Sequence, residues 1–364
     1  MISMRYAWNF AHGDGLMWNP GERIQGYTNL LMTVMMSAAA LLADKSSAVL
    51  AVQATGVLLM LAIAAVTARI ADQVLRDAGE DRRQLLTVLS FFCALAYYPL
   101  AYWTLMGMET GLLTLLVLLA VWSAFDYVDS RRRARLFVVA LSLDGAVLTR
   151  MDAVLFAGLI WIFVAYELAV PALRERLKHL VGPLILLAAV VGGLLAFQYW
   201  YYGAWLPNTY TLKLTGMPLA ARIENGIGFV APFLLESSLV LAAGIAATIL
   251  TCRSRTALLM SMVLVAIGYE VYVGGDPWNY WRIMAPAMPL ALLLAVIAVS
   301  RGITVGMRPR VPGTLTAPAL IVAATVTIVL SASVRFLPEI SLARKPYLAE
   351  NNRRTSTSPC CSIR

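Results

Sequence analysis

The chain has 364 residues, of which 60% are hydrophobic and 13% are charged, and its mean hydropathy is +0.75. Soluble globular domains carry about 25% charged residues, so this composition excludes an ordinary soluble domain and indicates a multi-pass membrane protein. The net charge is +9, but the basic residues lie mainly between apolar runs, where membrane orientation accounts for them. We therefore predict the lipid bilayer, and no nucleic acid, as a partner.

The first 47 residues form the longest polar and aromatic segment ahead of the apolar runs, and we predict that they are an active-site loop. Glycines at 13, 15, 21 and 26 permit tight turns within this segment. An apolar run at 28–42 then predicts a Met-rich helix that lies along the membrane surface. The polar and aromatic residues of the loop are Arg5, Tyr6, Trp8, Asn9, His12, Asp14, Trp18, Asn19, Glu22 and Arg23.

Ten later runs approach the roughly 20 apolar residues that a membrane-spanning helix needs. We predict an all-α polytopic bundle of about ten transmembrane helices over residues 48–332. The spans are expected near 48–68, 85–103, 108–125, 136–150, 153–170, 180–200, 227–250, 257–273, 283–300 and 314–332. Residues 333–364 are a polar tail that is too short to bury a core, and we expect it to be disordered.

The positions of Lys and Arg predict the orientation of the bundle. If the ten spans alternate, 16 of the 29 Lys and Arg residues fall on one side, seven on the other, and six in the tail. Cytoplasmic loops carry the excess of basic residues, so the loop at 1–47 is predicted to lie outside. An external N-terminus needs a span to carry it across, and residues 1–27 contain no signal peptide. We therefore expect a further transmembrane helix upstream of Met1.

Ionisable groups gather at the external mouths of the predicted spans. Arg150 with Asp152, Lys213, and Asp276 with Arg282 lie there, where charged groups are functional candidates. Cations at such places suit a phosphate, and carboxylates suit a general base or sugar hydroxyls. A structural ion pair is the alternative for Arg150 and Asp152, and a membrane-interface belt is the alternative for the nearby Trp and Tyr residues. Soluble-type phosphate, zinc and serine-hydrolase motifs are absent from the sequence.

Five segments carry a resemblance to a known family. The segments 3–29, 107–110 (GMET), 148–152 (LTRMD), 201–210 and 273–289 resemble, in this order, blocks of bacterial GT-C membrane glycosyltransferases. Within that group, the segments resemble those of the arabinofuranosyltransferases of the actinobacterial cell wall. The first and last segments are specific, whereas GMET and LTRMD alone are weak signals.

The resemblance implies an inverting GT-C enzyme on the outer face of the plasma membrane. It would move a sugar, such as arabinofuranose, from a polyprenyl-phosphate donor to a cell-envelope glycan. The residues implied for binding the donor phosphate are Arg5, Arg23, Arg150 and Arg282, and those for sugar or acceptor hydroxyls are Glu22, Asn208 and Asp276. Tyr6 and Asp152 complete the predicted substrate-binding set.

The catalytic base is where the sequence departs from the family pattern. Family members usually carry Asp-Asp-Ala immediately before the segment that corresponds to Met1–Tyr6, and one of these aspartates is the expected base. We therefore expect the base upstream of Met1; in the sequence as it stands, Asp14 and Glu22 are the nearest substitutes, and without a base the protein would be inactive. Some GT-C relatives use a divalent ion, but no ligand set is identified here and no cofactor is predicted.

Two other functions fit the same composition. A transporter or flippase of lipid-linked sugars would keep its site near the bilayer midplane, usually between two related halves. The sequence shows no such internal repeat, and its polar segments cluster on one predicted face, which favours the transferase. An inactive partner in cell-wall synthesis is the third interpretation.

Overall fold

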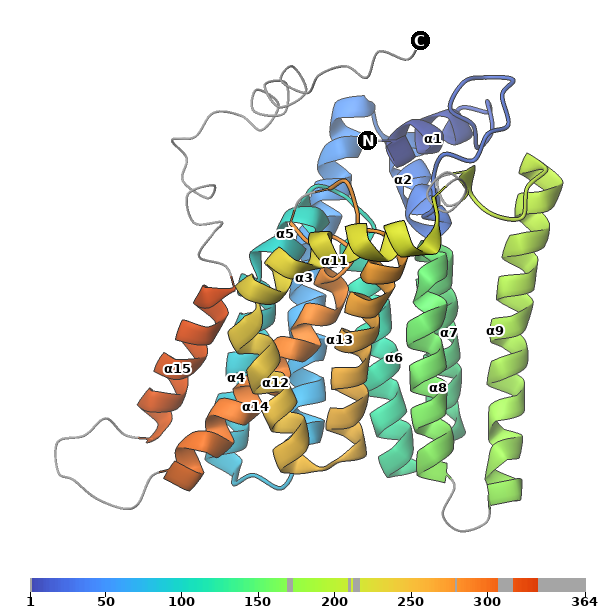
Figure 1. The fold of residues 1–364 in the computed structure, drawn as a ribbon. Coiled ribbons are helices and arrows are strands. Elements are labelled where there is room, and N and C mark those ends of the chain that lie inside the picture. Colours follow the sequence, from blue (N-terminus) through green and yellow to red (C-terminus); the bar gives the residue numbers. More distant parts are fainter. Residues whose placement is uncertain are drawn as a thin grey trace, which may run out of the picture.

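The computed structural model describes residues 2–168, 173–208, 211, 217–278, 280–306 and 317–332. These residues form helices and no strands (Figure 1). Two short 3-10 helices, η1 (Met151–Ala153) and η2 (Ala285–Ala287), precede α8 and α14. The α-helices are α1 (Ile2–Ala11), α2 (Leu30–Leu42), α3 (Lys45–Val74), α4 (Glu80–Ala96), α5 (Tyr98–Leu105), α6 (Thr110–Ser130), α7 (Arg133–Thr149), α8 (Val154–Leu168), α9 (Leu173–Tyr202), α11 (Leu219–Glu236), α12 (Ser238–Thr251), α13 (Ser254–Val273), α14 (Met288–Gly306) and α15 (Ala317–Ser331).

All ten predicted spans coincide with helices, but they are not ten equal spans. Within the described ranges, six helices are long and apolar enough to cross a membrane, or eight if each of two bent pairs forms one span. The helix α7 at the predicted span 136–150 has 17 residues and carries Arg133 and Arg135 in its first turn, and α15 has 15 residues. Residues 169–170 and 314–316 of the predicted spans, and the predicted tail at 333–364, lie outside the described residues.

Two spans that we predicted as continuous are broken. The pair α4 and α5 bends by 55°, and the pair α11 and α12 bends by 81°. Pro99 accounts for the first break because it has no N–H to continue the hydrogen bonding of α4, whereas proline is tolerated in the first turn of a new helix such as α5. In α11, Arg222 and Glu224 make the first turns polar, so this helix lies across the upper end of the bundle in Figure 1 instead of continuing the line of α12.

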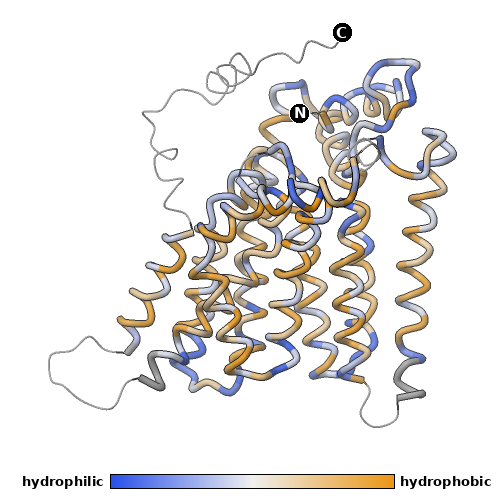
Figure 2. The backbone as a smooth tube through the Cα atoms, in the orientation of Figure 1, coloured by the Kyte–Doolittle hydropathy of each residue, from blue (hydrophilic) through white to orange (hydrophobic). Residues whose placement is uncertain are grey.

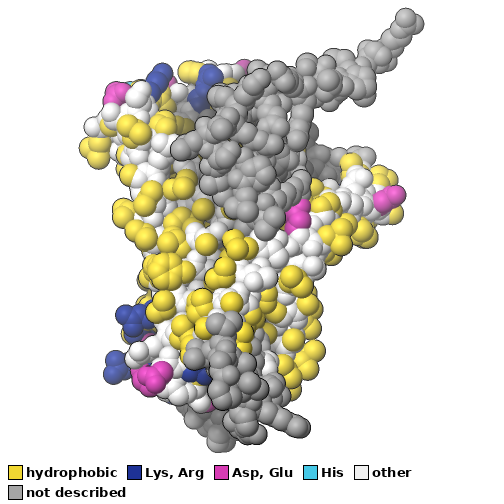
Figure 3. Space-filling view, turned by 90° about the vertical axis from the view of Figure 1, so that its left-hand side faces the viewer, with side chains coloured by type: hydrophobic (Ala, Val, Ile, Leu, Met, Phe, Trp, Pro, Cys, Tyr) yellow, Lys and Arg dark blue, Asp and Glu magenta, His cyan; other side chains and the backbone are white. Residues whose placement is uncertain are grey.

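The bundle is apolar along its middle and polar at its two ends. Figure 2 shows hydrophobic backbone positions along the length of the upright helices, with hydrophilic positions at the upper loops and lower turns. The face in Figure 3 likewise has a broad hydrophobic surface, and most of its visible charged side chains lie towards the ends. These two views agree with a multi-pass membrane protein.

The alternation of loops places the basic connections together. The connections at 75–79, 131–132 and 252–253 all lie at the lower end in Figure 1, opposite α1, α2 and α11. Arginines at this end pair with acids of neighbouring segments, as Arg76 and Arg255 both do with Asp129. Which end faces the cytoplasm stays a prediction from the Lys and Arg distribution.

Small residues allow the bent helix α5 to pack closely against the bundle. A Cβ atom on Gly56 of α3 would lie 2.6 Å from the carbonyl oxygen of Thr104, and one on Gly111 of α6 would lie 2.3 Å from the Thr104 Cγ2 atom. Such close approaches are typical of membrane helices, where packing and not hydrophobic burial drives association. The glycines therefore fix α5 beside the first turn of α6.

Candidate functional site

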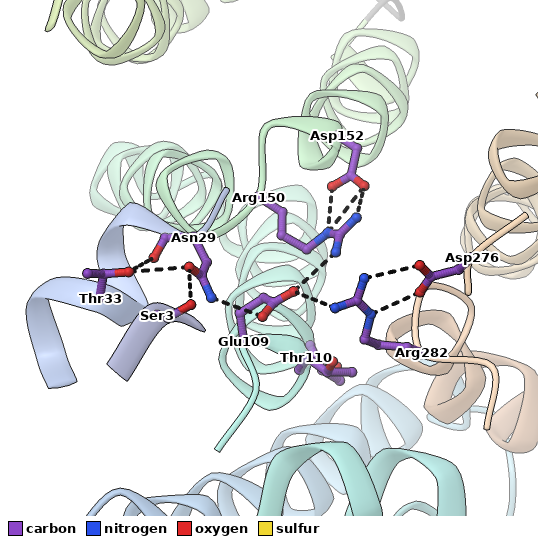
Figure 4. A network of polar contacts seen from close by, with 10 residues as sticks. Ser3, Asn29, Thr33, Glu109, Thr110, Arg150, Asp152, Asp276 and Arg282 are labelled. Carbon is purple, nitrogen blue, oxygen red and sulfur yellow. Dashed lines mark hydrogen bonds and ion pairs between the residues drawn. The ribbon is translucent and has the colours of Figure 1, made fainter. Parts of the chain in front are cut away.

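A cluster of buried polar side chains lies at the upper end of the bundle, where several helices begin or end (Figure 4). Glu109 immediately precedes α6, Arg150 follows the last residue of α7, and Asn29 immediately precedes α2. Asp276 and Arg282 come from the segment that follows α13. Helix ends supply these residues because charged groups are least costly where the apolar run stops.

Arg150 connects two carboxylates. Its Nε atom donates to Asp152 Oδ1 at 3.0 Å, and its Nη1 atom donates to Glu109 Oε1 at 3.1 Å. The backbone at Arg150 is extended, with φ −156° and ψ 127°, so the chain turns sharply between α7 and η1 and brings Asp152 back beside Arg150. The predicted pair of Arg150 and Asp152 is therefore present, with Glu109 as a third member.

Arg282 makes the corresponding contacts from the other side. Its Nε atom donates to Asp276 Oδ2 at 3.0 Å, and its Nη1 atom lies 3.9 Å from Glu109 Oε1. The guanidinium also lies 5.9 Å from the ring centre of Trp103 and 6.0 Å from that of Trp278, within the range of cation–π attraction.

An unusual backbone conformation precedes Arg282. Tyr280 and Trp281 have φ values of 59° and 51°, in the left-handed region that bulky residues rarely adopt. Each such residue costs about 1–3 kcal/mol and persists only when its surroundings hold it. Trp103 Nε1 donates to the Tyr280 carbonyl at 3.1 Å, and Trp281 Nε1 donates to Glu236 Oε2 at 2.9 Å. These two indole hydrogen bonds fix the turn that delivers Arg282.

Glu109 is the centre of the cluster and is 2% exposed. While Arg150 and Arg282 face its Oε1 atom, its Oε2 atom accepts a hydrogen bond from Asn29 Nδ2 at 3.0 Å. Asn29 Oδ1 in turn accepts from Ser3 Oγ of α1 at 2.9 Å and from Thr33 Oγ1 of α2 at 3.3 Å. This carboxylate thus links α1 and α2 to the bundle by hydrogen bonds, in addition to the packing of α2 on α3.

Among the described residues of the cluster, the formal charges do not cancel. Two guanidinium groups, of Arg150 and Arg282, face the three carboxylates of Glu109, Asp152 and Asp276. Removing either arginine from such a buried network leaves a further uncompensated carboxylate, which typically costs about 3–5 kcal/mol. Each guanidinium also keeps further N–H groups that have no hydrogen-bond partner within the described residues.

A small pocket opens beside the two arginines. Its cavity volume is about 20 Å³, which is room for a water molecule. Its polar lining includes Arg150, Asp152 and Arg282 together with Thr110, the first residue of α6, whose end carries partial positive charge. The rest of the lining is mainly apolar and consists of Leu113, Leu155, Phe156, Val265, Ala266, Tyr269, Ile283 and Pro286.

The first loop folds over α1 and the end of α9. Tyr6 is buried, and its hydroxyl donates to the Ile24 carbonyl at 2.7 Å and accepts from the Gly26 N–H at 2.9 Å. Tyr202 donates to the Leu16 carbonyl at 2.7 Å and lies 3.1 Å from the Tyr27 hydroxyl. Burial raises the pKa of Tyr27 to about 12, so its hydroxyl stays protonated in neutral solution. The hydroxyl contacts of Tyr6 to Ile24 and Gly26 thus hold the first loop together from inside.

The remaining predicted residues are exposed on this loop. Arg5 donates to the Trp18 carbonyl at 3.0 Å and stacks on the Trp18 ring at 4.4 Å, while Arg23 lies 5.0 Å from the Tyr201 ring centre. Glu22 accepts from Asn19 at 3.0 Å. The side chain of Asp14 is exposed to solvent.

The structure therefore divides the predicted site residues into two groups. Arg150, Asp152, Asp276 and Arg282 meet in the buried cluster. The other group belongs to the first loop, and Asn208 joins it through its N–H, which donates to the Gln25 carbonyl at 3.3 Å. Lys213 lies outside the described residues.

Sequence reasoning missed Glu109 and Asn29, which connect the cluster. Glu109 is the acid of the GMET segment, so its place at the mouth of a predicted external span was a usable signal. Asn29 gave no such signal, because an asparagine before an apolar run is an ordinary helix cap. Within the described residues, no group of three or more His, Cys, Asp or Glu side chains is arranged to hold a metal ion.

The backbone is similar to that of archaeal oligosaccharyltransferase from Archaeoglobus fulgidus. The crystal structure of its apo form matches with a TM-score of 0.51 and 12% sequence identity, covering 91% of this chain and 50% of that one. The structure of the same enzyme, AglB, in complex with an inhibitory peptide and a dolichol-phosphate matches with a TM-score of 0.51 and 11% identity over the same shares. No protein-family model and no curated protein sequence matches the chain.

At this identity the likeness shows the fold alone. It supports the GT-C membrane fold that the sequence resemblance implies, and it does not extend to the arabinofuranosyltransferases. The chain spans about half the length of the two solved structures that it matches.

Proposed function

We propose that this protein is a membrane glycosyltransferase that takes its sugar from a lipid-phosphate donor. The observation that carries the proposal is the pocket beside Arg150 and Arg282, which joins cationic groups to an apolar lining at the polar end of the bundle. A lipid phosphate has this combination of features, because its charged head and its apolar tail are adjacent.

The chemistry of the pocket suits a phosphate, for which its volume of about 20 Å³ must widen. Guanidinium groups form charge-assisted hydrogen bonds with phosphate oxygens, and the start of a helix such as α6 adds backbone N–H groups and partial positive charge. The apolar residues below, including Leu113 and Phe156, would contact the first carbons of the lipid. An isoprenoid tail would continue into the bilayer, so such a donor needs no nucleotide-binding domain.

The fold comparison supports the same donor class. The archaeal oligosaccharyltransferase of similar fold has been solved with a dolichol-phosphate and an inhibitory peptide. A lipid phosphate is therefore compatible with this arrangement of helices. Transfer of this property to the present chain is our proposal and rests on its own two arginines.

The finer assignments follow the family resemblance. We propose a polyprenyl-phosphate sugar, with arabinofuranose as the first candidate, as the donor, and a cell-envelope glycan on the outer face of the plasma membrane as the acceptor. The acceptor hydroxyl needs a base. Asp14 and Glu22 are the candidates on the first loop, where both carboxylates are exposed to solvent that an acceptor would share.

The test is to incubate membranes containing the protein with a radiolabelled polyprenyl-phosphate sugar. We expect label in glycan with the wild-type protein and none with Arg282→Ala, at equal membrane insertion of the two. Arg133→Ala, an exposed arginine at the opposite end of α7, is the matched control and should transfer normally. Near-normal transfer by Arg282→Ala would refute the site, and labelled donor that crosses the bilayer unchanged would indicate a flippase instead.

A further inference from the structure

The Glu109 carboxylate occupies a position that an anionic ligand would take. Its Oε1 atom lies 3.1 Å from Arg150 Nη1 and 3.9 Å from Arg282 Nη1, so one carboxylate oxygen is placed between two guanidinium groups from different segments (Figure 4). Two guanidinium groups around one anionic oxygen are the typical surroundings of a bound phosphate.

The three acids of the cluster differ in what they do to the arginines. Asp152 and Asp276 each pair with an arginine close to them in sequence, through two oxygens. Such pairing fixes the direction of one guanidinium and leaves its remaining N–H groups available. Glu109 alone contacts both arginines, and it comes from a third segment.

The charge balance makes Glu109 unfavourable to an incoming phosphate. With three carboxylates around two guanidinium groups, the cluster repels another anion unless one carboxylate moves away or is neutralised. On its other side Glu109 faces the neutral Asn29, held by Ser3 and Thr33, so no further cation among these groups offsets the third carboxylate. Tyr269 lines the adjoining pocket.

We propose that Glu109 is an internal competitor of the donor phosphate, whose carboxylate holds Arg150 and Arg282 together in the empty site and gives them up when the phosphate binds. This inference rests on the proposed phosphate site. The Glu109 side chain then keeps two arginines at a suitable separation without ligand, and it weakens phosphate binding so that the lipid phosphate product can leave.

Calorimetry tests this inference by measuring the binding of farnesyl phosphate to the detergent-solubilised full chain. Farnesol, which lacks the phosphate, is the matched control ligand. Glu109→Gln removes the competing charge and keeps the shape, and we expect it to bind farnesyl phosphate about tenfold more tightly than wild type. Glu109→Asp keeps the charge but shortens its reach, so we expect a smaller gain in affinity. Asp276→Asn removes the same charge from an acid that fixes one arginine, and we expect weaker binding.

The outcomes separate this inference from the proposed function. If wild type prefers farnesyl phosphate over farnesol and Arg282→Ala loses that preference, the phosphate site stands. Glu109→Gln binding no more tightly than wild type would then overturn the competitor role alone. If wild type shows no preference for the phosphate, the site itself is wrong. Should Glu109→Gln fail to fold, Glu109→Asp decides, because equal or weaker binding by that variant contradicts the inference.

Discussion

A single methyl group at Gly226 should disturb the candidate site from a distance. Gly226 lies in α11 against α13, and a Cβ atom there would lie 2.2 Å from the Val271 carbonyl oxygen and 2.7 Å from the Val271 Cα atom. Both are backbone atoms of a packed helix, so they cannot yield as a side chain would. Gly226→Ala must therefore push α11 away from α13.

The free-energy cost of this steric clash can be separated from the effect of helix propensity by a second glycine in the same helix. A methyl group added at Gly228 would meet no atom of a neighbouring segment within 4 Å, so Gly228→Ala adds only helix propensity, worth about 0.5–1 kcal/mol. Gly226→Ala gains the same propensity but overpacks the contact, which typically costs about 1–3 kcal/mol. We expect the stabilities of the two variants to differ by about 1–3 kcal/mol, with Gly226→Ala the less stable.

The displacement should also reach the arginine cluster. Phe229 and Phe233 of α11 pack on Trp281 with ring centres 5.6 and 5.7 Å away, and Glu236 accepts the Trp281 indole N–H. Because Trp281 directly precedes Arg282, a shift of α11 loosens the turn that delivers the guanidinium. Binding of farnesyl phosphate should fall in Gly226→Ala and stay unchanged in Gly228→Ala.

Cys93 offers a reporter for the stability measurement. Its thiol is buried in α4, whereas Cys252 is exposed, so a thiol-reactive dye labels Cys93 only on unfolding once Cys252, Cys360 and Cys361 are replaced by serine. Apparent midpoints are compared at one heating rate, since unfolding of membrane proteins is commonly irreversible. Equal midpoints and equal ligand affinities in the two alanine variants would refute the close packing of α11 on α13.

Three further predictions concern the cluster and the first loop. Arg150→Met leaves Glu109 and Asp152 buried without their shared guanidinium and should cost about 3–5 kcal/mol in the same dye assay; a midpoint equal to that of Arg133→Met would contradict the buried pairing. Tyr202→Phe loses the hydroxyl contacts to Leu16 and Tyr27, so limited proteolysis within residues 12–26 should accelerate, with Tyr199→Phe unchanged as the control. Burial raises the pKa of Tyr27 from 10 to about 12, so its contribution to loop stability is complete below pH 10 and lost as the pH rises through about 12. Proteolysis of the loop that already accelerates below pH 10 would show that Tyr27 is not buried.

The sequence alone predicted the positions of the apolar helices and the end at which the polar groups collect, but not α1, which lies within the predicted first loop. Apolar runs and the positions of Arg150, Asp152, Asp276 and Arg282 are local features, so they can be read without knowing what they contact. The pairing of Arg150 with Asp152 is also local, since the two residues are close neighbours in the chain. The prediction of these four as site residues thus needed no long-range information.

The centre of the cluster could not be predicted in the same way. Glu109 meets Asn29 across 80 positions and Arg150 across 41, and no local pattern encodes such distances. The bends at Tyr97 and Ser237 were missed because hydropathy continues through both of them, although Pro99 was a local signal for the first bend. Packing, in particular of Gly56 and Gly111 on Thr104, decides where α5 lies.

The arrangement of the bent helices bears on the choice between transferase and transporter. Transporters place broken helices at the bilayer midplane, so that the site can be reached alternately from both sides. Here α5 and α11 lie towards the upper end of the bundle in Figure 1, and the Glu109 cluster is built from helix ends on that same side. A site built from helix ends on one side of the bundle fits the transferase that we propose better than a passage through the bilayer.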